Sequence, residues 1–286
     1  MSIINRLYRY NLLSDKLYLQ IMYRLRMGQP LNLENPTTFT EKMQWLKLYN
    51  RKPEYVIMAD KVKAKEWVAQ RIGKEYVIPT LGVWERAEDI DFASLPNRFV
   101  IKCNHNSGKG MYICKDKTKM DEHNVRDGLS KGLKEDYFHH NGEWPYKDVP
   151  RRIIAEQFME ENGNSGDLKD YKFFCFNGKV KFFKIDFDRF TNHGANYYSP
   201  DGKLLEFGEA EYPPKPEKEL DLPANLSIMI TFAEELSKDL PFLRVDFYSI
   251  NNRIYFGELT FYPSSGMGKF TSFEWDKNIG SMITFI

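Results

Sequence analysis

Apolar residues recur at helical spacing near the start of the chain. Within residues 1–27 they fall at intervals typical of one helix face: Ile3, Leu7, Leu12, Leu17, Ile21, Met22 and Leu25. Thr38 and Glu41 in the segment TFTE form a capping box, and Met43–Tyr49 supplies the apolar face of the next helix. These patterns predict that the chain begins with helices.

One more helix is expected before the pattern changes. Asp60 fits the N-cap of a helix over Lys61–Ile72, and Gly73 fits its end. From Tyr76 onward, short apolar runs between turn residues predict strands instead. The expected strands are Tyr76–Trp84, Arg98–Asn104, Met111–Lys115, Arg152–Phe158, Tyr171–Phe176, Val180–Asp188, Asn196–Tyr198, Lys203–Glu206, Arg244–Tyr248 and Ile254–Thr260.

Turn and helix signals complete the pattern. Pro79 predicts that the first strand lies at a sheet edge, and Asn177-Gly178 predicts a hairpin turn. Asp121–Phe138 and Asn225–Leu240 have helical composition. The order of elements predicts an α+β fold with two sheet-bearing lobes that meet near residue 155. We expect a helical N-terminal segment over 1–75 and two sheet-bearing subdomains over 76–155 and 156–286.

Composition narrows the class of protein. Apolar residues make up 42% of the 286 residues and charged residues 28%, which is typical of a soluble globular protein. A net charge of +1 gives no support to a nucleic-acid partner. Three cysteines without metal-type spacing indicate a reducing compartment, and no apolar run approaches the ~20 residues that a membrane span needs. The start of the chain does not have the pattern of a signal peptide, so we expect a cytoplasmic protein.

The polar residues of the first 27 positions are mainly basic. They include Arg6, Arg9, Lys16, Arg24 and Arg26 against one acid, Asp15. A basic amphipathic helix can lie on an anionic membrane, which would place the protein at the inner membrane face. More often, such a helix packs its apolar stripe on its own domain. The sequence leaves both interpretations open.

The segment Leu243–Lys269 carries the clearest candidate chemistry. Arg244 and Asp246 share one face of a strand, and Glu258 and Thr260 share one face of the next, because side chains alternate along a strand. An odd-length hairpin loop would bring both pairs onto the same sheet face. Mg²⁺ binds a few carboxylate oxygens and completes its shell with water and phosphate. The pattern therefore predicts a metal-binding face, with an ordinary solvated hairpin as the alternative.

A lysine and a glycine-rich loop form a second candidate. Lys102 lies inside the apolar run RFVIKCN and needs a partner or a path to solvent. Phosphate oxygens would be such a partner, and the loop Ser107-Gly108-Lys109-Gly110 could direct backbone N–H groups at the same phosphates. The loop is not a P-loop, because it has GKG in place of GK[ST]. The alternative for Lys102 is an edge-strand lysine that reaches water.

A nucleotide base could bind where the run IIAEQFME turns polar. An adenine ring needs apolar walls, an acceptor for N6 and a backbone N–H for N1. Glu156 or a nearby carbonyl could be the acceptor, and Phe158 and Met159 could supply the backbone groups. Asp170 and Lys172 follow on one strand face, where they could reach ribose and phosphate.

The segment Asp186–Tyr198 is the best candidate for substrate contact. Arg189 can bind a carboxylate through two hydrogen bonds, and His193 and Asn196 add polar groups, with a plain polar hairpin tip as the alternative. A metal site at His139-His140 is disfavoured, because adjacent side chains point apart on regular structure. Cys103 has no identifiable base partner, so a small buried filler is expected there.

Taken in order, these motifs resemble the ATP-grasp superfamily. The closing stretch RVD, then ELT, then SSGM resembles the metal-binding hairpin of D-alanine–D-alanine ligase-like enzymes. Thr260 stands where that pattern has asparagine, which bears on whether one or two metals bind. A fuller resemblance is to the TupA-like ATP-grasp family of cell-surface polysaccharide and teichuronopeptide biosynthesis. It covers roughly residues 30–270 and rests on these segments: NPTTFTEKMQWLKLY, ADK, LPNRFVIKCNHNSG, AEQFM, DYKFFCFNG, DFDRFTNH and RVDFY.

The resemblance implies an ATP-grasp fold whose two lobes clamp the nucleotide, the first as a lid. It implies ATP and Mg²⁺ as cofactors, and a carboxylate and an amine as substrates. By analogy, ATP would be held by Lys61, Lys102, Ser107, Gly108, Gly110, Glu156, Phe158, Met159, Asp170 and Lys172. The metal would be held by Asp246, Glu258 and Thr260, and catalysis would rest on Arg244, Lys102 and Arg189.

The function expected from this resemblance is ATP-dependent carboxylate–amine ligation through an acyl phosphate. Phosphoryl transfer asks a protein mainly for positioning and charge neutralisation, which fits a site of lysines, an arginine and carboxylates. The expected product is a cell-surface polysaccharide, or its precursor, that carries an amino acid. A kinase or a non-catalytic nucleotide-binding component of a polysaccharide assembly system is the alternative.

Overall fold

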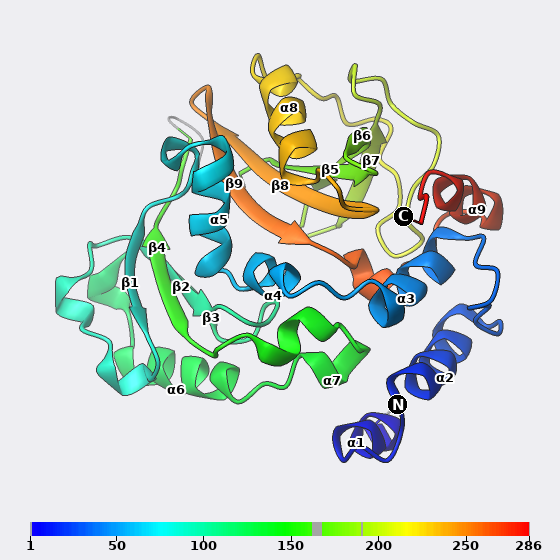
Figure 1. The fold of residues 1–286 in the computed structure, drawn as a ribbon. Helices are drawn as coiled ribbons and strands as arrows, with labels where there is room; N and C mark the ends of the chain where they lie inside the picture. The colour runs from blue at the N-terminus through cyan, green and yellow to red at the C-terminus, as the bar shows by residue number, and fades with distance from the viewer. Residues whose placement is uncertain (1, 162–167, 190, 286) are drawn as a thin grey trace.

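The computed structural model describes residues 2–161, 168–189 and 191–285, which form two antiparallel sheets surrounded by helices (Figure 1). The α-helices are α1 (Ser2–Arg9), α2 (Asp15–Met27), α3 (Phe39–Tyr49), α4 (Glu54–Ala59), α5 (Lys63–Ile72), α6 (Glu122–Leu133), α7 (Phe138–Asn141), α8 (Leu226–Leu236) and α9 (Phe273–Ser281). The strands are β1 (Thr80–Trp84), β2 (Phe99–Cys103), β3 (Met111–Cys114), β4 (Ile153–Gln157), β5 (Asp170–Phe176), β6 (Lys179–Phe187), β7 (Gly194–Tyr198), β8 (Phe242–Ile250) and β9 (Arg253–Thr260). Short 3₁₀ turns are η1 (Lys74–Tyr76), η2 (Ala87–Asp89), η3 (Phe92–Ser94), η4 (Lys117–Lys119), η5 (Trp144–Asp148) and η6 (Pro263–Gly266).

The first sheet has the strand order β1-β4-β2-β3. The predicted hairpin of β2 and β3 is confirmed, as is the edge position of β1. The prediction that this edge strand begins at Tyr76 is wrong, because Lys74–Tyr76 closes into a 3₁₀ turn after α5. Ile101 and Cys103 lie buried among the residues of α6, so strand alternation turns Lys102 to the opposite face.

The second sheet has the order β7-β6-β5-β8-β9, with the predicted turn at Asn177-Gly178 between β5 and β6. The predicted strand over Lys203–Glu206 is wrong. Only Leu204 forms a bridge, with Tyr198, before the chain leaves the sheet and bonds to residues 269–271. There the Ala210 N–H donates to the Lys269 carbonyl at 2.8 Å, which draws the chain away from β7.

The two faces of the second sheet have different coverings. On one face, Phe247 packs against Phe232 of helix α8, which closes that side of the core. On the other face, Phe39 of α3 packs edge-on against Phe242. The remainder of that face is charged and includes Lys172 and Asp246, which are direct neighbours across β5 and β8. The core therefore leaves one charged area on the sheet, opposite the first sheet.

The β8–β9 hairpin places Asp246 opposite Glu258 as expected, but a bulge and not an odd-length loop produces this register. Its loop is not odd-length: Ile250 pairs with Arg253 around a two-residue turn, Asn251-Asn252, in which both residues have positive φ. The odd residue is instead a bulge at Gly257, where the pairing shifts between Asp246 and Phe247. Without this bulge, Glu258 would point to the other face of the sheet.

The N-terminal helices agree with the sequence pattern in part. The Thr38–Glu41 capping box is confirmed. The single amphipathic helix expected over 1–27 is wrong, because the chain breaks into α1 and α2 around Asn11, which has positive φ. The helix expected over Lys61–Ile72 begins only at Lys63, and Asp60 directly follows α4. Asp60 still accepts hydrogen bonds typical of an N-cap, from the Val62 N–H to its side chain at 2.9 Å and from the Ala64 N–H to its carbonyl at 2.8 Å.

Two further helix predictions need adjustment at their ends. The helix expected over Asp121–Phe138 ends at Leu133, and α7 begins separately at Phe138. The helix expected over Asn225–Leu240 ends at Leu236. Both corrections shorten an element without changing its type.

A buried lysine ties the N-terminal helices to both halves of the molecule. Lys47 of α3 is fully buried, and its Nζ donates to the carbonyls of Asn141 and Ser265, each at 2.8 Å. Glu143 lies close by and accepts a hydrogen bond from the Ser265 hydroxyl at 2.7 Å. Burial lowers the pKa of Lys47 and raises that of Glu143. This contact holds the turn after β9 against the segment after α7.

Candidate functional site

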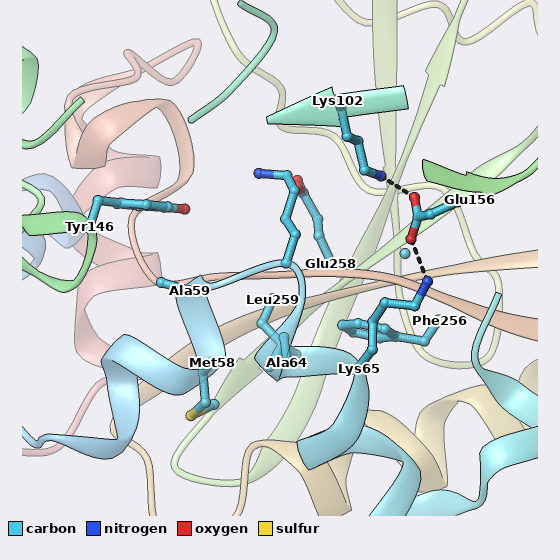
Figure 2. Close-up of a pocket in the computed structure, with 12 residues that line it drawn as sticks. Met58, Ala59, Ala64, Lys65, Lys102, Tyr146, Glu156, Phe256, Glu258 and Leu259 are labelled. Atoms are coloured by element: carbon cyan, nitrogen blue, oxygen red, sulfur yellow. Dashed lines mark hydrogen bonds and ion pairs between the residues drawn. The ribbon is translucent and has the colours of Figure 1, made fainter. Parts of the chain in front are cut away.

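A pocket lies between the two sheets, where the end of α4 and the start of α5 meet β2, β4 and β9 (Figure 2). Polar side chains from separate segments enter it together. They are Lys61, Lys65, Lys102, Tyr146, Glu156 and Glu258, and the apolar lining comes from Met58, Ala59, Ala64, Phe256 and Leu259. Figure 2 shows the Tyr146 hydroxyl directed toward the middle of this group.

Glu156 holds two lysines at the centre of the pocket. Its Oε2 lies 2.5 Å from the Lys102 Nζ, and its Oε1 accepts a hydrogen bond from the Lys65 Nζ at 2.6 Å (Figure 2). Burial opposes ionisation of this carboxyl, but the two ammonium groups outweigh it and lower the pKa of Glu156. Burial also lowers the pKa of Lys65, against the pull of Glu156. Strand β2 lies inside the sheet, so Lys102 is not an edge-strand lysine.

Lys61 is positioned by a buried polar network behind it. The carboxylate of Asp60 accepts hydrogen bonds from the Asn104 amide at 2.7 Å and from Arg152 at 2.6 Å. Asn104 follows β2 and Arg152 precedes β4, so the network fastens the α4–α5 turn to both strands. The Lys61 Nζ then donates to the Asn106 carbonyl at 2.6 Å, and burial lowers its pKa.

The four residues predicted for the β8–β9 face lie together. Arg244 donates to both carboxylate oxygens of Asp246 and to Oε1 of Glu258, each at 2.7 Å. The Thr260 hydroxyl donates to the same Glu258 oxygen at 3.3 Å. Burial raises the pKa of Asp246, although Arg244 opposes this. For Glu258 burial acts in the same direction, but Arg244 and Lys61 prevail and lower the pKa.

Asp170, Lys172 and Arg189 meet in a neighbouring network on the same sheet. The Lys172 Nζ donates to Asp170 at 2.6 Å and to Asp186 at 2.5 Å. Arg189 donates through Nη2 to the same two carboxylates, at 2.9 and 3.1 Å. His193 contacts the other oxygen of Asp186 at 3.1 Å. The buried Oδ1 of Asp170 has no hydrogen-bond partner within the described chain.

Other predicted residues lie outside the pocket lining. Ser107, Gly108 and Gly110 form the turn between β2 and β3, and a Cβ on Gly110 would come within 2.7 Å of the Cys103 sulfur. Gly110 therefore serves close packing against α6. Phe158 and Met159 follow β4, and Arg98 lies 4.3 Å from the centre of the Phe158 ring. Their predicted roles toward a nucleotide stay predictions.

The structure also describes the histidine pair and the cysteine that the sequence analysis disfavoured as a metal site and as a nucleophile. His139 and His140 each contact a different carboxylate, Asp136 and Glu135. No group of three or more metal-ligating side chains of His, Cys, Asp and Glu occurs in the part of the chain that the structure describes. Burial raises the pKa of the Cys103 thiol to about 11, so this buried cysteine is not an activated nucleophile.

Sequence reasoning missed three residues. Lys65 could have been found, because it follows Lys61 by four positions, the spacing of one helix face. Asp186 shares a strand face with Lys184 on β6, but the sequence indicated it only as the first residue of the Asp186–Tyr198 segment. Tyr146 lies in a 3₁₀ turn, where no periodic signal singles it out.

A family model described as TupA-like ATPgrasp matches residues 41–284. The match covers most of the chain, so the protein belongs to the TupA-like ATP-grasp family. This confirms the predicted resemblance and, with the two antiparallel sheets, the predicted α+β fold class. No curated protein matches the chain.

Solved structures that match include several ligases. D-alanine–D-alanine ligase from Helicobacter pylori is 16% identical, with a TM-score of 0.47 over 86% of this chain and 69% of that one. D-alanine–D-alanine ligase from Bacillus anthracis, complexed with ATP, is 16% identical, with a TM-score of 0.42 over 71% of this chain and 53% of that one. Phosphoribosylamine–glycine ligase from Thermotoga maritima is 17% identical, with a TM-score of 0.43 over 72% of this chain and 48% of that one. The chain thus spans about half the length of two of these ligases.

Proposed function

We propose that this protein is an ATP-dependent ligase that joins a carboxylate to an amine through an acyl phosphate. One observation carries the proposal: Lys61 and Lys102 enter the same pocket as Glu258, and Glu258 is bridged by Arg244 to Asp246. The lysines that would bind phosphate thus lie beside the carboxylates that would bind a hard metal ion. Family membership supports the same chemistry.

ATP would lie between the lobes with its phosphates against Lys61 and Lys102. The two lysines on Glu156 form a preorganised cationic group, because the carboxylate holds both ammonium groups in place before phosphate arrives. Transfer of Lys102 to a phosphate oxygen would free one oxygen of Glu156 to accept a hydrogen bond from adenine. The unpartnered Oδ1 of Asp170 is a suitable acceptor for a ribose hydroxyl.

The donor set fits Mg²⁺. Asp246, Glu258 and Thr260 present hard oxygen atoms on one sheet face, and hard oxygens are the ligands that this ion prefers. Asp246 and Glu258 would hold the ion, with Thr260 in place of an amide ligand. When bound, Mg²⁺ supplies charge neutralisation for the phosphates.

Arg244 would stabilise the charge that develops during transfer. The burial of its guanidinium is outweighed by Asp246 and Glu258, which raise its pKa and keep it cationic. Attack of the substrate carboxylate on the γ-phosphoryl group gives the acyl phosphate and ADP. Attack of the amine then releases phosphate, and the negative charge on the tetrahedral intermediate would lie near this cation.

Substrate recognition would involve the Asp186–Tyr198 segment. In the contacts described, Arg189 uses only Nη2, so its other N–H groups are available to a carboxylate. We propose a cell-surface polysaccharide, or its precursor, as the carboxylate and an amino acid as the amine. The predicted role of the TupA-like family in surface-polymer biosynthesis supports this choice.

Phosphate release from MgATP tests the proposal. Uronic acids and amino acids would be supplied singly and in pairs, and we expect release only when an acid and an amine are both present. Lys102→Ala, Asp246→Ala and Glu258→Ala should each lower turnover by about 100-fold or more. Lys115→Ala, at an exposed site beyond β3, is the matched control.

The other outcomes are equally informative. ADP formation that needs an acid alone, with no release of phosphate, would identify a kinase and contradict ligation. Full turnover in all three variants would contradict the assignment of the site.

A further inference from the structure

Exposed apolar side chains gather at the start of the chain. Of 16 exposed large hydrophobic residues in the described chain, six lie within the first 25 positions: Ile3, Leu7, Tyr10, Leu12, Leu17 and Leu25. Ile3 is 73% exposed, Leu12 68% and Leu25 57%. Isolated exposed apolar residues need no explanation, but this concentration does.

The exposed residues follow the outward faces of both helices. In α1, Ile3 and Leu7 are four positions apart and Tyr10 follows three later, which places them on one side. In α2, Leu17 and Arg24 are seven positions apart on one side, with Leu25 next to them, and the buried Leu19 lies on the opposite side. Leu12 joins the two stripes through the connecting turn. Figure 1 shows α1 and α2 at the periphery of the molecule, away from both sheets.

The inner faces of these helices are firmly attached. Tyr8 and Tyr18 stack with ring centres 3.9 Å apart, and the Tyr18 hydroxyl donates to the His140 carbonyl at 2.6 Å. Arg26 donates to the Asn141 side chain at 2.8 Å. Rotating these helices to bury their exposed apolar residues would therefore break these contacts.

The charge beside the stripe is positive. Arg6, Lys16 and Arg24 are exposed, and none of them pairs with a carboxylate among the residues that the structure describes. Asp15, the single acid of the segment, is already paired with Arg51 at 2.6 Å. An apolar stripe beside unpaired basic residues matches an anionic lipid surface, because acyl chains accept the stripe and lipid phosphates accept the cations.

We propose that the outward face of α1 and α2, defined by Ile3, Leu7, Tyr10, Leu12, Leu17 and Leu25 with Arg6, Lys16 and Arg24, docks on anionic membranes. This inference is independent of the proposed catalytic activity. No helix in residues 2–161, 168–189 and 191–285 is long and apolar enough to cross a membrane. The docking is therefore interfacial. It would place the pocket near the lipid surface, because α2 rests on the segment that leads to Tyr146.

Co-sedimentation of the whole protein with vesicles tests this. We expect binding to phosphatidylcholine vesicles that contain phosphatidylglycerol, weak binding to phosphatidylcholine alone, and release by added salt. The triple variant Arg6→Glu/Lys16→Glu/Arg24→Glu should bind at least about tenfold less. Lys115→Glu/Lys119→Glu/Lys131→Glu changes the net charge equally at exposed sites elsewhere and should bind as the wild type does.

A second pair of variants tests the apolar part. Leu7→Gln/Leu17→Gln should lower vesicle binding several-fold, whereas Ile228→Gln, at a site 47% exposed on α8, should not. Circular dichroism would show that each variant is folded. Failure of the wild type to bind anionic vesicles, or equal loss in the control triple variant, would overturn the proposal. So would a lipid-free dimer that Leu7→Gln/Leu17→Gln dissociates, because the face would then belong to a second copy.

Discussion

Glu156 carries one negative charge between two lysines, Lys65 and Lys102, in a largely buried setting. Replacing it by glutamine removes the charge that both ammonium groups share and keeps the side-chain volume. We expect Glu156→Gln to lower the free energy of unfolding by about 3–5 kcal/mol, because breaking a buried ion pair leaves uncompensated charge. Urea denaturation followed by circular dichroism measures this change.

The same substitution four residues later provides the control. Glu160 pairs with Arg98 at 2.5 Å, but its side chain is 52% exposed. Glu160→Gln should therefore cost less than about 1 kcal/mol. Equal effects at the two positions would show that burial does not set the strength of the Glu156 pairs.

At this scale the sequence predicted some site residues and missed others for physical reasons. Lys102 was noticeable because a lysine inside an apolar strand needs a partner, but the sequence could not show that Glu156 is that partner. Their contact depends on the pairing of β2 with β4, whose residues are about 50 positions apart. Lys65 was missed because a lysine on a helix is ordinarily solvated, so its position alone does not indicate a buried partner.

Among the elements, the β8–β9 hairpin reaches its register through a bulge at one residue, Gly257. Deleting Gly257 would remove the bulge and still leave Glu258 opposite Asp246, because Phe256 and Glu258 already pair with adjacent residues of β8. We expect this variant to keep ATP turnover within about tenfold of the wild type, because Glu258 and Thr260 stay on the charged face. Turnover and urea denaturation would both be measured.

A substitution at the same position tests the bulge itself. A Cβ on Gly257 would lie 3.1 Å from the Asp246 carbonyl oxygen, so Gly257→Val crowds the bulge. If the bulge is lost, the substituted residue enters the strand pairing and Glu258 turns to the buried face. Turnover should then fall by about 100-fold or more, and full turnover of Gly257→Val would contradict the role of the bulge.

At the scale of elements, local sequence patterns were sufficient to predict some features of the fold but not others. Alternation and turn residues predicted the β2–β3 and β5–β6 hairpins, because these signals lie within a few positions of each other. The Gly257 bulge could not be predicted, since it is defined only by the opposite strand. The break at Asn11 was missed because the apolar spacing of α1 continues almost in phase into α2.

At the scale of the whole molecule, the ion pairs of the second sheet make the free energy of unfolding depend on pH in the acid range. Burial opposes ionisation of Asp186, but Lys184, Lys172 and Arg189 hold its pKa far below the usual 3.8. As pH falls, the unfolded chain therefore takes up a proton at this group before the folded protein does. The stabilisation that Asp186 gives is present above about pH 4, and about 1 kcal/mol of it is lost by about pH 3.

Comparison with an uncharged variant isolates this effect. Asp186→Asn should be less stable than the wild type near neutral pH, and its urea midpoint should fall less steeply between about pH 5 and pH 3. Asp127→Asn, at a site 53% exposed, should keep the wild-type slope. Parallel slopes for the wild type and Asp186→Asn would contradict the role of Asp186.

The pocket draws its lysines and carboxylates from four segments spread between Lys61 and Glu258. No contiguous piece of the chain holds enough of them to bind a nucleotide between charges of both signs. A chimaera of two homologous genes with one crossover between Lys102 and Asp246 would take the lysines proposed to bind phosphate from one parent and the carboxylates proposed to bind the metal from the other. Recombination within the family is therefore constrained across this interval, where the parental halves must already match.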